Sequence, residues 1–135
     1  MRILAIDYGK KRIGLAISDP FGSYALPLCV LENKKGIFLE IKNYCDKYEI
    51  TTIVLGLPKT LTGEMSFSVQ ETNGFADKLK LVLKIPIERW DERLTSKIAE
   101  KMLISSGVKR DDRKASIDKI SACLILNEYL EKNAK

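Results

Sequence analysis

The feature that most constrains the fold is an apolar run that leads directly into an acid and a glycine, Arg2-Ile3-Leu4-Ala5-Ile6-Asp7-Tyr8-Gly9. Apolar residues at both odd and even positions predict a strand that is buried on both faces. A carboxylate at the exit of such a strand is costly to bury unless another group compensates its charge. Asp7 is therefore a candidate functional residue, although an acid at a strand end is more often a turn or cap residue.

Apolar patterning predicts one α/β domain over residues 1–135. Strands are expected over residues 2–7, 12–18, 24–31, 51–57 and 85–90. Helical spacing of apolar residues predicts helices over about residues 37–48, 66–84, 95–106 and 114–131. A polar loop is expected over residues 59–65, and a charged connector over residues 108–114.

The order of these elements predicts a mixed five-stranded sheet. The first three strands are joined by short turns and form an antiparallel meander, and Pro27 indicates that the third strand lies at an edge. The two later strands follow helices, so they are expected to run parallel within the same sheet. Helices should then cover both faces of the sheet.

The composition excludes several kinds of chemistry. The chain has no histidine, which rules out Ser-His-Asp and Cys-His catalysis and histidine-based zinc sites. Its three cysteines lie far apart among apolar neighbours and are expected to be small buried thiols. No apolar run approaches the ~18 residues that cross a membrane, and the N-terminus lacks a signal-peptide pattern. We expect a cytoplasmic protein with no membrane partner, either a monomer or a homodimer.

Acids that are distant in sequence are expected to meet at one edge of this sheet. Ligands bind outside the carboxyl ends of parallel strands, where Asp7 ends the first strand and Asp91-Glu92 ends the fifth. Asp118 lies early in the last helix, and small residues on its side of that helix favour a close approach to the sheet. Clustered carboxylates coexist most readily around a hard divalent cation such as Mg²⁺. Two such ions can promote hydrolysis of a phosphodiester.

Basic residues surround the predicted acidic edge. They lie in the first hairpin, in the loop after the fourth strand, and directly after the acid pair: Lys10, Lys11, Arg12, Lys59 and Arg93. With a formal net charge of +5, they suit the backbone of a nucleic acid. A lysine-rich surface that serves only solubility is the alternative interpretation.

The motifs of the chain, in this order, resemble those of the YqgF family, also called RuvX. The resemblance extends over essentially the whole chain. It rests on Ile6-Asp7-Tyr8-Gly9, on Arg12-Ile13-Gly14-Leu15-Ala16-Ile17-Ser18-Asp19, on Gly56-Leu57-Pro58 with Gly63, on Asp91-Glu92-Arg93-Leu94-Thr95-Ser96, and on Ile117-Asp118 with Ala122. It implies an RNase H-like fold and a catalytic, metal-binding triad at Asp7, Glu92 and Asp118. Other RNase H-like nucleases commonly carry the second acid on the fourth strand, where this chain has Gly56-Leu57 instead. The match at Glu92 is therefore open to an alternative, in which Asp91 shares or takes that role.

The resemblance also implies a function. It points to a nuclease that uses Mg²⁺ or Mn²⁺ to cleave structured RNA, in maturation of the 5′ end of pre-16S rRNA. One alternative is a resolvase of four-way DNA junctions, with branched DNA as the partner. Another is a non-catalytic nucleic-acid-binding factor with the same fold. On either nuclease reading, the loop over residues 59–65 is a mobile flap over the substrate or a simple connector.

Overall fold

The computed structural model describes residues 2–57, 67–91 and 110–133, without the side chains of residues 57, 67–69, 72, 91, 110–119 and 133. Within these ranges the strands form a five-stranded sheet in the order β3-β2-β1-β4-β5. β1 pairs antiparallel with β2, and β2 with β3, whereas β4 lies parallel to both β1 and β5. The strands are β1 (Arg2–Asp7), β2 (Arg12–Ser18), β3 (Ala25–Glu32), β4 (Ile50–Leu57) and β5 (Ile87–Asp91). The predicted meander with two parallel strands is confirmed.

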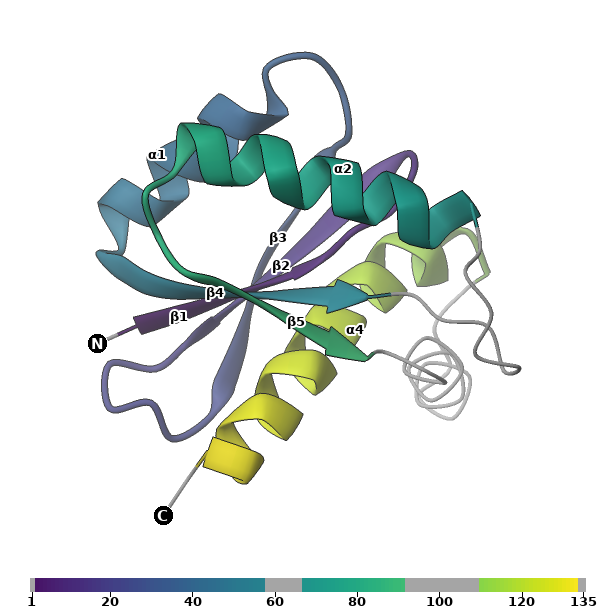
Figure 1. Cartoon of the computed structure of the whole chain (residues 1–135). Helices are drawn as coiled ribbons and strands as arrows, with labels where there is room; N and C mark the ends of the chain where they lie inside the picture. The colour runs from purple at the N-terminus through teal and green to yellow at the C-terminus, as the bar shows by residue number, and fades with distance from the viewer. Residues whose placement is uncertain (1, 58–66, 92–109, 134–135) are drawn as a thin grey trace.

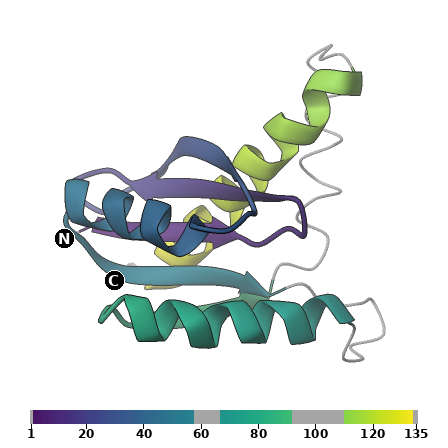
Figure 2. The same cartoon turned by 90° about the horizontal axis from the view of Figure 1, so that it is seen from above.

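Helices cover both faces of the sheet, as predicted (Figure 1). α1 (Ile37–Lys47) and α2 (Phe67–Val82) lie on one face, and α4 (Arg110–Asn133) crosses the other. Figure 2 shows α1 and α2 side by side when the sheet is seen from above. No helix within the described residues is long and apolar enough to span a membrane. The helix predicted over residues 95–106 and the loop predicted over residues 59–65 lie outside the described residues.

The larger core lies between the sheet and the pair α1 and α2. Leu4 and Ile6 of β1 are fully buried there, together with Ile41 of α1 and Leu79 of α2. Ala5, which lies between Leu4 and Ile6, is also fully buried but faces the opposite side of the sheet. The prediction that the first strand is buried on both faces is therefore confirmed.

The core beneath α4 is built from small side chains. Ala5 of β1, Ala16 of β2 and Ala122 of α4 are each 0% exposed and belong to one cluster. Methyl groups at all three positions allow the helix to lie close to the two strands. Leu126 and Leu130, one and two turns further along α4, extend the same contact.

α4 begins earlier than the sequence pattern indicated. The connector predicted over residues 108–114 is wrong from residue 110 onward, because α4 already starts at Arg110. The first residues of α4 are mostly charged and show no apolar periodicity, but they precede a segment that does. A charged segment without apolar periodicity can therefore be helical where it continues an amphipathic helix.

The strand bounds differ from the prediction mainly at β5. This strand starts at Ile87, two residues later than expected. Pro86 has no N–H to donate to a ladder, but its carbonyl oxygen accepts a hydrogen bond from the N–H of Ile53 at 2.9 Å. The segment before β5 is thus fastened to β4 without being part of the sheet.

The β2–β3 loop is organised by a buried acid. The Asp19 carboxylate is 3% exposed and accepts hydrogen bonds from the backbone N–H groups of Ser23 at 2.6 Å, Tyr24 at 2.8 Å and Phe21 at 3.2 Å. Burial alone raises the pKa of Asp19, but these N–H groups more than offset that effect and hold the pKa below its usual value. Asp19 therefore shapes this loop, a role that the sequence motif did not reveal.

Candidate functional site

Asp7 ends β1 in the middle of the sheet and is only 7% exposed. Its neighbours in register are Gly14 of β2 and Gly56 of β4, and Gly56 has Trp90 of β5 as its own neighbour. Because both flanking residues are glycines, no side chain from β2 or β4 stands directly beside this buried acid.

Asp7 lies on the sheet face that α4 covers. Side chains two residues apart in a strand share a face, and Ala5 packs against Ala122 of α4. Trp90, in the same row as Asp7, also lies on this face, since its ring contacts Tyr129 of α4 edge-on with centroids 5.6 Å apart. The carboxylate at the strand end and the helix that carries Asp118 are thus on the same side of the sheet.

Side-chain contacts fasten α4 to the edge strand β5. The Trp90 Nε1–H donates a hydrogen bond to Glu128 Oε2 at 3.2 Å, and the Lys132 ammonium lies 5.3 Å from the centre of the indole ring. A hydrogen bond to Glu88 raises the pKa of Tyr129 to about 12, with burial as a second cause. These contacts fasten the part of α4 around Glu128 to β5, whereas the helix packs mainly over β2, β3 and β1.

The other predicted acids are described only in part. Asp91 is the last residue of β5 and pairs in register with Leu57, but its side chain is outside the described part of the chain. Glu92 lies outside it altogether. Asp118 belongs to α4, four residues before Ala122, without a described side chain. Among the described residues no three potential ligands form a group that could hold a metal ion.

The donor that is described fits a divalent cation. Mg²⁺ and Mn²⁺ prefer carboxylate oxygens and water, and Asp7 offers a carboxylate at the end of β1, with a glycine beside it on each neighbouring strand. The cysteines do not provide a competing site. Burial raises the pKa of Cys45 and of Cys123 to about 11, so both thiols are protonated at neutral pH. Cys45 is buried as expected, whereas Cys29 and Cys123 are only partly buried, and none of the three forms a disulfide.

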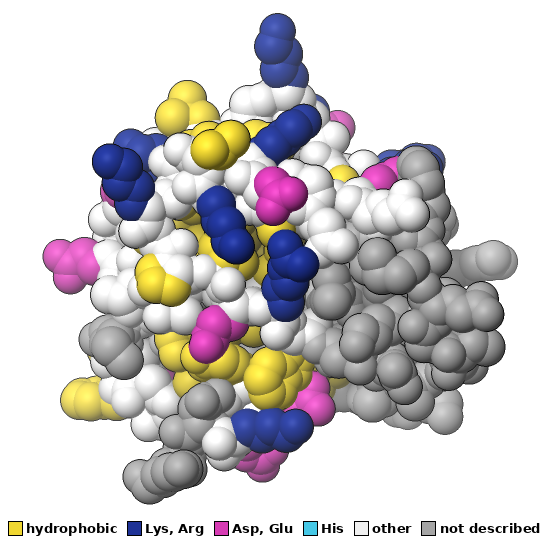
Figure 3. All heavy atoms as spheres, in the orientation of Figure 1, with side chains coloured by type: hydrophobic (Ala, Val, Ile, Leu, Met, Phe, Trp, Pro, Cys, Tyr) yellow, Lys and Arg dark blue, Asp and Glu magenta, His cyan; other side chains and the backbone are white. Residues whose placement is uncertain are grey.

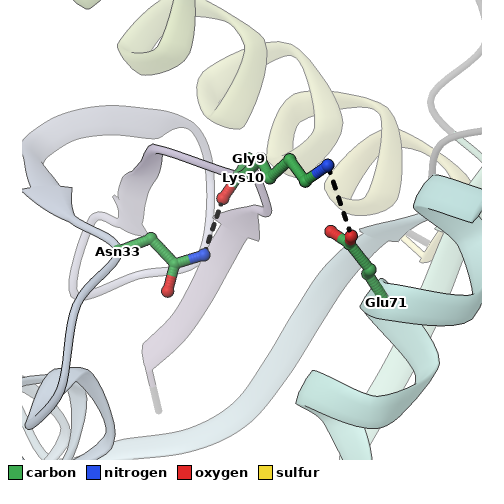
Figure 4. A network of polar contacts seen from close by, with 4 residues as sticks. All are labelled: Gly9, Lys10, Asn33 and Glu71. Carbon is green, nitrogen blue, oxygen red and sulfur yellow. Dashed lines mark hydrogen bonds and ion pairs between the residues drawn. The ribbon is translucent and has the colours of Figure 1, made fainter.

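The turn that follows Asp7 is held by Asn33, as Figure 4 shows. The Asn33 Nδ2 group donates a hydrogen bond to the carbonyl oxygen of Gly9 at 2.9 Å. Its backbone N–H donates to the carbonyl oxygen of Lys11, also at 2.9 Å. Gly9 itself cannot be replaced without rearrangement, because a Cβ there would collide with the carbonyl oxygen of Arg12. Asn33, 26 residues after Asp7 in the sequence, therefore fixes the turn that leaves the candidate site.

Three of the five predicted nucleic-acid-binding residues lie on this turn. Lys10 and Lys11 are exposed, and Arg12 at the start of β2 is partly buried. The Lys10 ammonium lies 3.7 Å from Glu71 Oε1 of α2, and this pair of an exposed lysine and a partly buried glutamate joins the turn to that helix (Figure 4). Lys59 and Arg93 lie outside the described residues.

Positive charge is distributed rather than concentrated on the face seen in Figure 3. Lysine and arginine side chains stand mainly over the half of this face where α1 and α2 lie, with acidic and hydrophobic side chains between them. This pattern gives a moderate positive potential. It agrees with the net charge of +5 and does not form one continuous basic patch on this face.

Solved structures confirm the fold. The chain matches Thermus thermophilus RuvC in complex with a Holliday junction substrate, with a TM-score of 0.61, 14% identity and coverage of 99% of this chain and 97% of that one. It also matches the fowlpox virus resolvase in complex with Holliday junction DNA, with a TM-score of 0.56, 13% identity and full coverage of both chains. The sheet order and these matches show an RNase H-like fold.

Relatives in sequence are much closer. A protein of Clostridium acetobutylicum named "Putative pre-16S rRNA nuclease" is 41% identical over 132 residues, which cover 96% of this chain and 98% of that protein. A protein of the same name from Syntrophomonas wolfei is 44% identical over 133 residues, which cover 97% and 94%. The family model described as RuvX, Holliday junction resolvase, matches residues 1–132. The chain therefore belongs to the RuvX family, as its motifs indicated.

Proposed function

We propose that this protein is a nuclease that hydrolyses phosphodiester bonds in structured RNA, in the maturation of the 5′ end of pre-16S rRNA. The observation that carries the proposal is Asp7, a buried carboxylate at the carboxyl end of the central strand, flanked by two glycines and facing α4. The name shared by relatives with 41% and 44% identity supports the substrate class.

We assign the metal-binding and catalytic roles to Asp7, Glu92 and Asp118. The register favours Glu92 over Asp91 as the second acid. Trp90 lies on the α4 face with Asp7. If the strand conformation continued for one residue beyond β5, position 92 would be the next to lie on that face.

The third acid is supported by helix geometry. Asp118 lies four residues before Ala122, and residues four apart share a face of a helix. Ala122 is fully buried against Ala5 and Ala16. The small side chains in this contact favour a close approach of α4 to β1, the strand that Asp7 ends.

These carboxylates would hold one or two divalent ions, Mg²⁺ or Mn²⁺, which when bound activate water and stabilise the leaving oxygen of a phosphodiester. The chain itself supplies the fixed positions. β1 and the clamped turn after it orient Asp7, and α4 is fastened to β5 through Trp90 and Glu128. Lys10, Lys11, Arg12, Lys59 and Arg93 are proposed to contact the nucleic-acid backbone, which makes binding sensitive to salt.

The test is the isosteric substitution Asp7→Asn. We expect cleavage of an RNA that contains the 16S 5′ precursor sequence to fall at least about 100-fold, as when other groups that stabilise developing charge are removed. Circular dichroism should show an intact fold. Asp46→Asn is the matched control, because Asp46 is an exposed carboxylate that pairs with Lys42 in the last turn of α1, shortly before the amino end of β4, whereas Asp7 lies at the carboxyl end of β1. Removal of divalent ions with a chelator should stop cleavage by the native protein.

A second candidate is resolution of four-way DNA junctions, which is supported by the fold match to RuvC with its junction substrate. The same proteins should therefore be given a four-way DNA junction. Cleavage of the junction but not of the RNA would favour the resolvase. Binding of either nucleic acid without metal-dependent cleavage would favour a non-catalytic factor. Full activity of Asp7→Asn would contradict the mechanism for both substrates.

A further inference from the structure

A pocket of about 280 Å³ lies on the other side of the clamped turn, between the start of α1 and the middle of α2. It has an aromatic wall and a polar rim, and its residues come from three separate segments of the chain. Those that carry the argument are Tyr8, Asn33, Phe38, Glu71, Phe75 and Lys78. Its volume is near the lower end, ~300 Å³, of pockets that hold small ligands, so it suits a group the size of a nucleotide and not a duplex.

The wall of the pocket consists of three rings. The Tyr8 and Phe75 rings are tilted by 48° with centroids 4.8 Å apart, and Phe38 stacks on Phe75 at 5.2 Å and 30°. Phe75 is buried, whereas Tyr8 and Phe38 keep part of their surface accessible. Aromatic side chains of this kind stack on nucleobases without regard to sequence.

The rim supplies hydrogen-bonding and charged groups. Asn33 and Glu71 line the pocket and are already oriented by the contacts to Gly9 and Lys10 shown in Figure 4. Lys78 is exposed on α2 at the same rim and is suited to a phosphate. A nucleotide, which joins a flat base to a phosphate, matches both parts of the pocket.

Gly74 gives an independent reason to regard the pocket as functional. It lies in the interior of α2 and lines the pocket, and a Cβ built there meets no atom within 4 Å. Glycine is the least favourable residue inside a helix apart from proline, and here neither a close contact nor a positive φ requires it. The absence of a side chain at this position keeps the pocket open.

The pocket is adjacent to the candidate active site. Tyr8 follows Asp7 directly, and alternation along the chain puts its ring on the α1–α2 face, where it contacts Phe75. If the scissile phosphate of a nucleic-acid strand lay at Asp7, that nucleic acid would pass over the Gly9 turn, and a neighbouring nucleotide would reach the pocket. We infer that this pocket binds an unpaired nucleotide of the substrate next to the cleavage site. This inference rests on the proposed function, since it takes the occupant to be part of a nucleic acid.

The sharpest test fills the pocket without disturbing the fold. Gly74→Leu introduces a helix-forming side chain into open space, and Gly74→Ala is the control for the change in helix propensity. A labelled single-stranded RNA pentamer, the same pentamer with an abasic central position, and adenosine 5′-monophosphate are the probes. Because stacking on aromatic side chains is lost, Gly74→Leu should weaken binding of the pentamer about tenfold. It should not affect the abasic pentamer, which lacks the base.

A charge variant tests the rim in the same way. Lys78→Gln should weaken binding of both the pentamer and the mononucleotide, whereas Lys42→Gln, which removes an exposed lysine from α1 outside the pocket, should not. In NMR titrations, the mononucleotide should shift the backbone amides of Phe38, Gly74 and Lys78 in the native protein.

The outcomes separate this inference from the proposed function. If the native protein and Gly74→Leu each bound the intact and the abasic pentamer equally well, the pocket assignment would be overturned. The proposal of cleavage at Asp7 would not be affected by that result. If the mononucleotide shifted the amide signals of the pocket but Gly74→Leu did not weaken binding of the pentamer, the pocket would be a site for free nucleotides. That result would also overturn the inference that it binds a nucleotide of the substrate. Pentamer binding that depends on the pocket, without cleavage of any substrate, would support the pocket and contradict the nuclease.

Discussion

The contact between Asn33 and Gly9 makes a prediction that can be worked out atom by atom. Asn33→Asp keeps the shape of the side chain but replaces the Nδ2 donor by an oxygen that faces the Gly9 carbonyl oxygen. A neutral hydrogen bond contributes about 0.5–1.5 kcal/mol, and two facing acceptors add repulsion, so we expect a loss of about 2 kcal/mol at pH 7. The backbone hydrogen bond from Asn33 to Lys11 remains in the variant.

Urea unfolding followed by circular dichroism measures this loss. With a urea dependence of roughly 1–3 kcal/mol per molar, 2 kcal/mol lowers the midpoint by roughly 0.7–2 M. The effect should depend on pH in a defined direction. The facing carbonyl raises the pKa of the new carboxyl in the folded state above about 3.9. Below pH 4 its protonated form can donate to Gly9, so the loss should be small there and should grow as the pH rises toward 6.

Asn33→Ala is the matched control for this pH dependence. It removes the donor without adding a titratable group, so its loss should be about 1 kcal/mol at pH 4 and at pH 7 alike. The nearest lysine in sequence, Lys34, pairs with Glu32 at 3.4 Å and is expected to change little. If Asn33→Asp unfolds at the native midpoint at pH 7, or if its loss is the same at both pH values, the clamp on the Gly9 turn is not as described.

Two further predictions concern α4. Ala122→Leu adds three carbons to the contact between α4 and the small side chains of β1 and β2. Overpacking should destabilise the protein by about 1–3 kcal/mol and should lower cleavage more than RNA binding. Glu131→Leu, at an exposed position of the same helix, is the control and should have neither effect. If Ala122→Leu behaved like the native protein, α4 would not lie close to the sheet. Tyr129→Phe removes a hydroxyl whose pKa is raised to about 12 by Glu88, so the stability advantage of the native protein over this variant should be constant below pH 10 and should shrink between pH 10 and pH 12. Urea midpoints of both proteins measured between pH 10 and pH 12 test the prediction for Tyr129. A stability advantage of the native protein that grew with pH in this range would contradict it.

Most of the sheet could be predicted from local pattern. The run from Ile3 to Ile6 has the continuous apolar character of a strand covered on both faces, and Pro27 marked the edge strand correctly. Asp7 is a candidate for the same reason, since an acid directly after a buried strand is unusual, and the structure confirms that it is buried. These signals lie within a few residues of one another, so they can be read without knowledge of the tertiary structure.

The features that the sequence did not reveal depend on contacts between distant residues. Asn33 lies between a predicted strand and a predicted helix, and only its hydrogen bond to Gly9, 24 residues earlier, makes it a clamp. Gly74 falls within a predicted helix, and the open space beside it is known only from the structure. Trp90 falls within a predicted strand, and its hydrogen bond to Glu128 joins residues 38 positions apart. A glycine inside a helix pattern is the one signal that could have drawn attention to the pocket.

The two edges of the sheet have a consequence for how the chain behaves in a crowded solution. In β3 the register shifts between Leu15 and Ala16 of its partner strand, next to Pro27, which has no N–H to offer. β5, at the other edge, is only five residues long and carries the exposed charges of Glu88 and Arg89. Short, charged or proline-interrupted edges resist pairing with a second chain. The folded protein is therefore protected from aggregation by strand addition, and we expect any self-association to use helices or loops instead of a continuous intermolecular sheet.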